Sequence, residues 1–228
     1  LDADGDLDLL VGDFNGFIKY YKNVSSGNNL NFTFIENAGD IDLSGNSVPT
    51  LGDLDNDGDL DLLIGQTNGS LAFYRNIGSI NEYTFIEEES AFSDIVSTGN
   101  SAPELIDIDM DGDLDLLLGT AYDGILLYRN IGDGVSFEFI LDPFIEIPYI
   151  GIHSKPTMAR LFSGGLFDLM VGISTGGVYH IQLERESCNM GDLNGDFSYN
   201  VLDIVALANC VLAANCEGCQ GDFNGDGS

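Results

Sequence analysis

Positive charge is scarce in this sequence. Seven lysines and arginines stand against 38 aspartates and glutamates, which gives a formal net charge of −31 at pH 7. Such a chain repels phosphate backbones and anionic membrane surfaces. We therefore expect no nucleic-acid partner. The sequence also lacks an apolar run long enough to cross a bilayer, so we expect no membrane span.

Histidine is scarce as well, and the sequence has no tryptophan. His153 and His180 each stand alone, with no Ser, Cys or paired carboxylate at a spacing typical of catalysis. We therefore expect a structural role for both and predict a protein that is not an enzyme. The chain begins at Leu1 with neither Met nor a signal segment, and we expect it to be a piece of a longer protein.

Acidic residues, by contrast, gather in regular loops. Residues 53–61 read DLDNDGDLD and lead into an apolar segment, and residues 107–115 repeat the pattern. Without a cation, each close carboxylate pair would repel by on the order of 1 kcal/mol. Gly58 permits the turn that lets these carboxylates converge, and an all-oxygen set suits Ca²⁺ better than Mg²⁺. A solvated acidic turn is the alternative, but the recurrence favours calcium.

A unit of about 53 residues recurs along the chain. Its apolar segment starts at Asp8, Asp61, Asp115 and Asp168. A turn pair follows each segment, as in Asn15-Gly16, and favours a β-hairpin with a two-residue turn. Further strands are predicted over 32–35, 83–86, 137–140, 47–51, 101–105 and 154–158. Four short antiparallel strands per unit predict an all-β fold built from β-propeller blades.

The motif DxDxDGxxD followed by an apolar strand resembles the FG-GAP or VCBS repeat of integrin-α-like β-propellers, over residues 1–186. The resemblance implies calcium in these loops and a propeller of about seven blades, so that blades upstream of the four visible ones are expected. The implied ligands are Asp53, Asp55, Asp57 and Asp61, then Asp107, Asp109, Asp111 and Asp115, with main-chain oxygens from Asp59 and Asp113, and, in an incomplete first loop, Asp2, Asp4, Asp6 and Asp8.

The fourth copy departs from this pattern. Arg160, Phe162 and Gly164 replace the first three acids, and only Asp168 remains. We expect Arg160 to pair with Asp168, so that this unit folds without an ion.

Three basic residues, Lys22, Arg75 and Arg129, share one position in their units. A ligand-binding role is one interpretation. A salt bridge to a neighbouring acidic loop is favoured, because the position recurs per unit instead of converging on one site.

Residues 187–228 break the period and contain all four cysteines. An apolar stripe from Val201 to Leu212 predicts a helix after a loop that is EF-hand-like in its spacing. This segment resembles a type I dockerin, which implies calcium and a cohesin-like partner. The candidate ligands are Asp192, Asn194, Asp196, Asn200 and Asp203 with the main-chain oxygen of Ser198, and, in an incomplete and weaker second loop, Asp222, Asn224 and Asp226.

The cysteines allow either two disulfides or a Cys₄ zinc site. Calcium loops indicate an oxidising, extracellular compartment, so disulfides are favoured, and three pairings stay open.

These features together predict a secreted or cell-surface, calcium-binding propeller for adhesion or for binding a glycan or protein, attached through its tail. Two alternatives remain open. One is a structural subunit of an extracellular assembly that self-associates through the tail. The other is the propeller of an extracellular polysaccharide-degrading enzyme.

Overall fold

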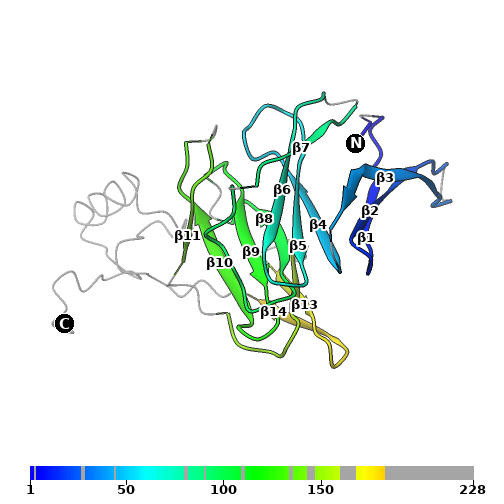
Figure 1. The fold of residues 1–228 in the computed structure, drawn as a ribbon. Coiled ribbons are helices and arrows are strands. Elements are labelled where there is room, and N and C mark those ends of the chain that lie inside the picture. Colours follow the sequence, from blue (N-terminus) through cyan, green and yellow to red (C-terminus); the bar gives the residue numbers. More distant parts are fainter. Residues whose placement is uncertain are drawn as a thin grey trace, which may run out of the picture.

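The computed structural model describes residues 1–2, 4–26, 29–43, 45–79, 82–89, 91–108, 111–133, 136–142, 147–159 and 168–182. Fourteen strands lie in this part, with no helix among them, and they form four antiparallel sheets (Figure 1). The predicted all-β fold is therefore confirmed for these residues. The dockerin-like segment, its helix and its cysteines lie outside them. No helix here is long and apolar enough to span a membrane.

Each sheet is a meander of strands that are consecutive in the sequence. The first contains β1 (Leu9–Gly12), β2 (Phe17–Asn23) and β3 (Phe32–Asp42). The second contains β4 (Ser47–Gly52), β5 (Asp61–Gln66), β6 (Leu71–Asn76) and β7 (Phe85–Glu87). The third contains β8 (Ala102–Ile106), β9 (Asp115–Gly119), β10 (Ile125–Asn130) and β11 (Phe139–Leu141). The fourth contains β12 (Lys155–Ala159), β13 (Asp168–Gly172) and β14 (Val178–Gln182). Four strands per unit are thus confirmed in the second and third sheets.

In the first three units the hairpin turn is longer than the predicted two-residue turn. The Asp13 N–H donates to the Phe17 carbonyl at 3.0 Å, which leaves residues 14–16 between them. The Gly16 N–H donates back to the Asp13 carbonyl at 3.2 Å, and Gly16 has a φ of 99°. A two-residue type I′ turn needs positive φ at both central residues, but Asn15 is not among the residues with positive φ. The two-residue prediction is therefore wrong for this hairpin, and a three-residue turn with one left-handed glycine takes its place. In the fourth unit both Gly176 and Gly177 have positive φ.

The core lies between the sheets, which pack face to face in sequence order. Ile18 of the first sheet belongs to the same apolar cluster as Leu62 and Ile64 of the second, and similar clusters join the second sheet to the third and the third to the fourth. Leu62, Leu63 and Ile64 are all fully buried although neighbouring side chains on a strand point to opposite faces. The second sheet is therefore covered on both faces, which explains the continuous apolar run in its β5 strand.

Neighbouring sheets come close together where a glycine of one sheet lies against the backbone of a serine of the next, as Gly65 does against Ser101. An ideal Cβ on Gly65 would lie 2.1 Å from the Ser101 carbonyl oxygen, so no side chain fits there. The buried Ser101 hydroxyl accepts the Gln66 N–H at 2.8 Å and donates to the Ser70 carbonyl at 2.7 Å. Ser101, directly before β8, thus binds the hairpin turn of the preceding unit through its hydroxyl.

We expect Ser101→Ala to lower the free energy of unfolding by about 1 kcal/mol, because the hydrogen bonds of the hydroxyl to the Gln66 N–H and the Ser70 carbonyl are lost. The direct bond from the Gln66 N–H to the Ser70 carbonyl, at 3.1 Å, remains. Urea unfolding at constant calcium measures this change. Ser174→Ala is the control, since Ser174 is exposed and its hydroxyl lies 3.3 Å from the Ile152 carbonyl. Its effect should stay within about 0.5 kcal/mol. Equal effects of the two substitutions would contradict this role of the Ser101 hydroxyl.

Candidate metal centre

The loop between β4 and β5 brings three of the predicted calcium ligands together. One carboxylate oxygen from each of Asp53, Asp55 and Asp57 lies within 4.8 Å of the others. Asn56 and Gly58 have φ values of 57° and 96°, so the backbone curls through the left-handed region at both positions. The Asp53 carboxylate accepts the N–H groups of Asp57 and Gly58 at 3.1 and 3.0 Å, which holds this curl. The structure thus brings the carboxylates of these three residues close together.

Two carboxylate oxygens in these loops are buried without a hydrogen-bond donor. Arg75 donates to Oδ2 of Asp55, but Oδ1 of Asp55 has no partner in the described part of the chain. Oδ1 of Asp107, in the equivalent loop before β9, is also buried and without a partner there. A buried polar atom left unpaired costs free energy, and native structures rarely contain one. A cation among the carboxylates would satisfy such an oxygen, and an all-oxygen set fits Ca²⁺.

The electrostatics of the loop show the expected repulsion. The pKa of Asp59 is raised above its ordinary value, first by burial and then by the negative charges of Asp57, Asp53 and Asp55. The pKa of Asp113 is raised in the same way, by burial and by the aspartates around it. A cation would relieve this repulsion.

Asp61, a predicted ligand, connects the acidic loop to the hairpin, because its carboxylate accepts a backbone N–H from each. It is 1% exposed and lies outside the group of three carboxylates. Its Oδ1 accepts the Asn76 N–H at 2.8 Å, and its Oδ2 accepts the Leu54 N–H at 3.2 Å. Burial raises the pKa of Asp61 to about 6. In the third unit, Asp115 accepts the N–H groups of Ile108 and Asn130. Sequence reasoning missed this second role, although an asparagine 15 residues after the aspartate recurs in both units.

The fourth unit keeps this aspartate but gives it a different partner. His180 Nε2 lies 2.6 Å from Oδ1 of the buried Asp168. Arg160, the predicted partner, lies outside the described residues together with Phe162 and Gly164. Tyr20 Oη similarly donates to Asp8 at 2.9 Å, and both pairs are 12 residues apart. This shared spacing could have identified His180 from the sequence.

Lys22 and Arg75, two of the recurrent basic residues, pair with the acidic loop of their own unit. Lys22 Nζ contacts Asp2 and lies 3.2 Å from Asp4 in the first loop. The Arg75 guanidinium contacts Asp55 in the second loop. For these two residues the predicted salt bridge to an acidic loop is confirmed.

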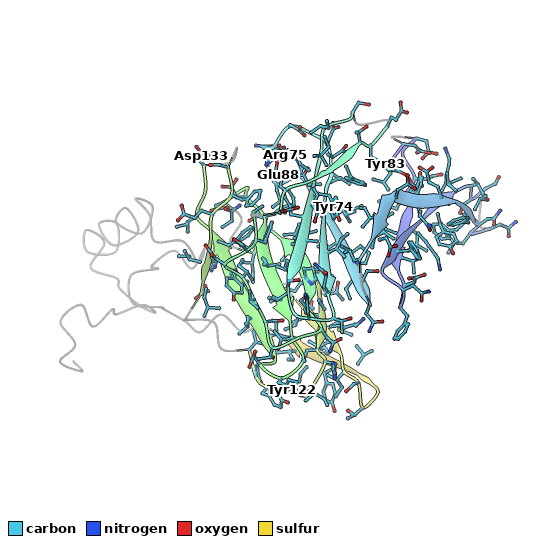
Figure 2. All side chains as sticks on the ribbon, viewed as in Figure 1. Tyr74, Arg75, Tyr83, Glu88, Tyr122 and Asp133 are labelled. Carbon is cyan, nitrogen blue, oxygen red and sulfur yellow. The ribbon has the colours of Figure 1, made fainter. Side chains whose placement is uncertain are left out.

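Basic residues at this position also hold the segment after the outer strand. Arg75 Nε lies 2.6 Å from Glu88, directly after β7, and Figure 2 shows the two side chains together. Arg129 Nε lies 2.9 Å from Asp142, directly after β11. Each cation therefore ties an outer strand to its sheet.

The family comparison identifies the unit. Residues 1–64 and 53–118 each match the family described as FG-GAP-like repeat, and together they span 118 of the 228 residues. This chain belongs to the FG-GAP-like repeat family. Repeats of this kind are typical of extracellular proteins. A comparison with curated proteins found no match.

The loop with residues 53–61 lies inside both matched segments. Each matched segment begins at one acidic loop, continues through the next acidic loop, and ends in the apolar strand after that second loop, which is β5 in one case and β9 in the other. The carboxylates that converge in the structure are thus part of the family unit itself.

The remaining predicted ligands are distributed as follows. Asp2, Asp4, Asp6 and Asp8 of the first FG-GAP-like repeat are described, with the Asp6 N–H donating to Asp4 at 3.0 Å. In the third repeat Asp107, Asp111, Asp113 and Asp115 are described and Asp109 is not. The ligands predicted in the tail all lie outside the described residues: Asp192, Asn194, Asp196, Ser198, Asn200, Asp203, Asp222, Asn224 and Asp226.

Proposed function

We propose that the FG-GAP-like repeats bind Ca²⁺ in their acidic loops and form blades of a calcium-stabilised β-propeller. Two observations carry this proposal: the convergence of one carboxylate oxygen each from Asp53, Asp55 and Asp57, and the buried Oδ1 of Asp55 that has no partner among the described residues. These three residues would hold the cation, with the equivalent residues doing so in the third loop. The ion supplies positive charge that cancels the repulsion and cross-links the loop.

The role proposed for the propeller is non-catalytic binding in a secreted or cell-surface protein. The acidic loops recur once per repeat instead of converging on one centre, which supports a structural role for the ion. The partner we propose is a glycan or an extracellular protein, because FG-GAP-like repeats are typical of extracellular proteins. Attachment to a cohesin-like partner is proposed from the dockerin resemblance of residues 187–228 alone.

Isothermal titration of the calcium-free chain with CaCl₂ tests the site. We expect the double substitution of Asp55→Asn and Asp57→Asn to remove one binding site or to weaken it at least tenfold. Glu88→Gln is the matched control, because it removes the other carboxylate that pairs with Arg75 and leaves the loop intact. Unchanged stoichiometry and affinity in the double variant would contradict the assignment.

A further inference from the structure

The hairpin turn between β9 and β10 carries an exposed tyrosine at a position where the other units have asparagine or threonine. Tyr122 lies in this turn, is 62% exposed, and is seen at the lower end of the sheet in Figure 2. The equivalent residues in the other three turns are Asn15, Asn68 and Thr175. A side chain that serves the repeat itself recurs in each unit, as the aspartates of the acidic loops do. The repeat therefore does not account for the exposed ring of Tyr122.

Two more rings lie against the same turn. Tyr149 is 60% exposed, and its Cδ2 atom lies 3.3 Å from the position of an ideal Cβ on Gly124, the last residue before β10. The centre of the His153 ring lies 6.1 Å from that of Tyr122. Three rings from two segments thus gather on one turn, and exposed apolar groups gathered in this way are typical of an interaction site.

The backbone under these rings is held in one conformation. The Thr120 hydroxyl donates to the Gly124 carbonyl at 3.1 Å and accepts the Asp123 N–H at 2.8 Å. His153 has a φ of 53°, and its N–H donates to a carbonyl of the turn at 2.9 Å. Asn100, the equivalent residue of the preceding repeat, has a φ of 48°, so this backbone conformation belongs to the repeat and the histidine ring is the local addition. Side chains carried on a fixed backbone lose less entropy when a ligand binds.

The chemistry of this cluster fits a neutral glycan. The apolar face of a sugar ring stacks on aromatic side chains, and sugar hydroxyls donate hydrogen bonds to carboxylates. Asp123 is exposed and follows Tyr122 directly in the turn. Residues 119–124 and 147–153 contain no lysine or arginine, which an acidic glycan would require, and the net charge of −31 opposes one. Three partly exposed rings alone fall short of the about 800 Å² that each side of a stable protein interface buries.

We infer that Tyr122, Tyr149 and His153 form a binding site for a neutral glycan, with the two tyrosines stacking on sugar rings and Asp123 accepting a sugar hydroxyl. The inference rests on the binding role proposed above and deepens it, because it selects the glycan from the two partner classes and names where it binds. The acidic loop 107–115 leads into β9, whereas the turn follows the end of β9. A cation in that loop therefore supports the fold without contacting the sugar.

Nuclear magnetic resonance on the isotopically labelled full chain in excess CaCl₂ tests this site. The probes are neutral hexasaccharides of glucose, mannose, galactose and xylose, with a heparin hexasaccharide as the acidic counterpart. We expect saturable amide shifts within residues 119–124 and 147–153 for at least one neutral probe and none for heparin.

Tyr122→Ala and Tyr149→Ala should each weaken this binding by about tenfold or more. Tyr122→Phe keeps the ring and should stay within about threefold of the wild-type affinity. Phe14→Ala is the matched control, because Phe14 is a 79% exposed aromatic side chain in the hairpin turn of the first unit, and it should leave binding unchanged. Both tyrosines are exposed, so the alanine variants should melt at the wild-type temperature.

The possible failures are distinguishable. Saturable shifts that both alanine variants leave unchanged would overturn the location and leave the glycan-binding role standing. A lack of shifts with every neutral probe at millimolar concentration would overturn both. Tighter binding of heparin, or of an oligolysine peptide that shifts the same amides, would assign the cluster to a charged partner and overturn the neutral glycan.

Discussion

Removing calcium with EGTA should lower the melting temperature of this protein by about 10–20 °C. At a free calcium concentration of 100 times the dissociation constant, each occupied loop contributes about 2.7 kcal/mol, so the loops at 53–61 and 107–115 together contribute about 5 kcal/mol. For a domain of this size, each kcal/mol shifts the melting temperature by about 2–4 °C. The physical cause is the repulsion among the carboxylates of each empty loop.

Differential scanning calorimetry with and without EGTA measures this shift. Adding excess CaCl₂ back should restore the original melting temperature, and an equal concentration of MgCl₂ should restore less of it because Mg²⁺ sheds its waters reluctantly. An unchanged melting curve in EGTA, with no residual metal by elemental analysis, would show that the loops do not depend on a cation.

The second large effect is expected at a glycine between two repeats. Gly65→Val should lower the free energy of unfolding by about 3 kcal/mol or more, because its Cβ would lie 2.1 Å from the Ser101 carbonyl oxygen. A backbone oxygen cannot rotate away as a side chain can, so the second and third sheets would have to separate. Urea unfolding at constant calcium measures the loss.

Gly172→Val is the matched control at the equivalent position in the fourth sheet. No described atom lies within 4 Å of a Cβ at Gly172, and valine favours strands, so its effect should be close to zero. Similar losses in the two variants would mean that the cost comes from the strand itself and not from contact between repeats.

Much of the fold follows from the local pattern. The segments that start at Asp61 and Asp115 locate the second strand of each meander, and the apolar runs predict burial on both faces. The turn type could not be predicted from the local sequence pattern, because Asn-Gly is compatible with more than one hairpin loop. In the structure the Ser47 hydroxyl, from the next sheet, binds the ends of the turn that contains Gly16. These bonds join residues that are 34 and 30 positions apart, and no local pattern contains them.

The candidate site was predictable where its residues are neighbours in sequence. Asp53, Asp55 and Asp57 converge because alternate residues of one curled loop can do so. The connection made by Asp61 was not predicted, because it depends on a backbone N–H that only the folded hairpin brings near. The pairing of His180 with Asp168 depends on the same hairpin geometry.

The most direct test of the cation site is a crystal structure grown in CaCl₂, with anomalous scattering recorded to locate calcium. We predict an anomalous peak within about 2.3–2.6 Å of carboxylate oxygens from Asp53, Asp55 and Asp57. Oδ1 of Asp55 would then have the partner that it lacks among the described residues. A well-ordered loop with no peak at saturating calcium, its carboxylates held by Arg75 and backbone N–H groups alone, would contradict the account.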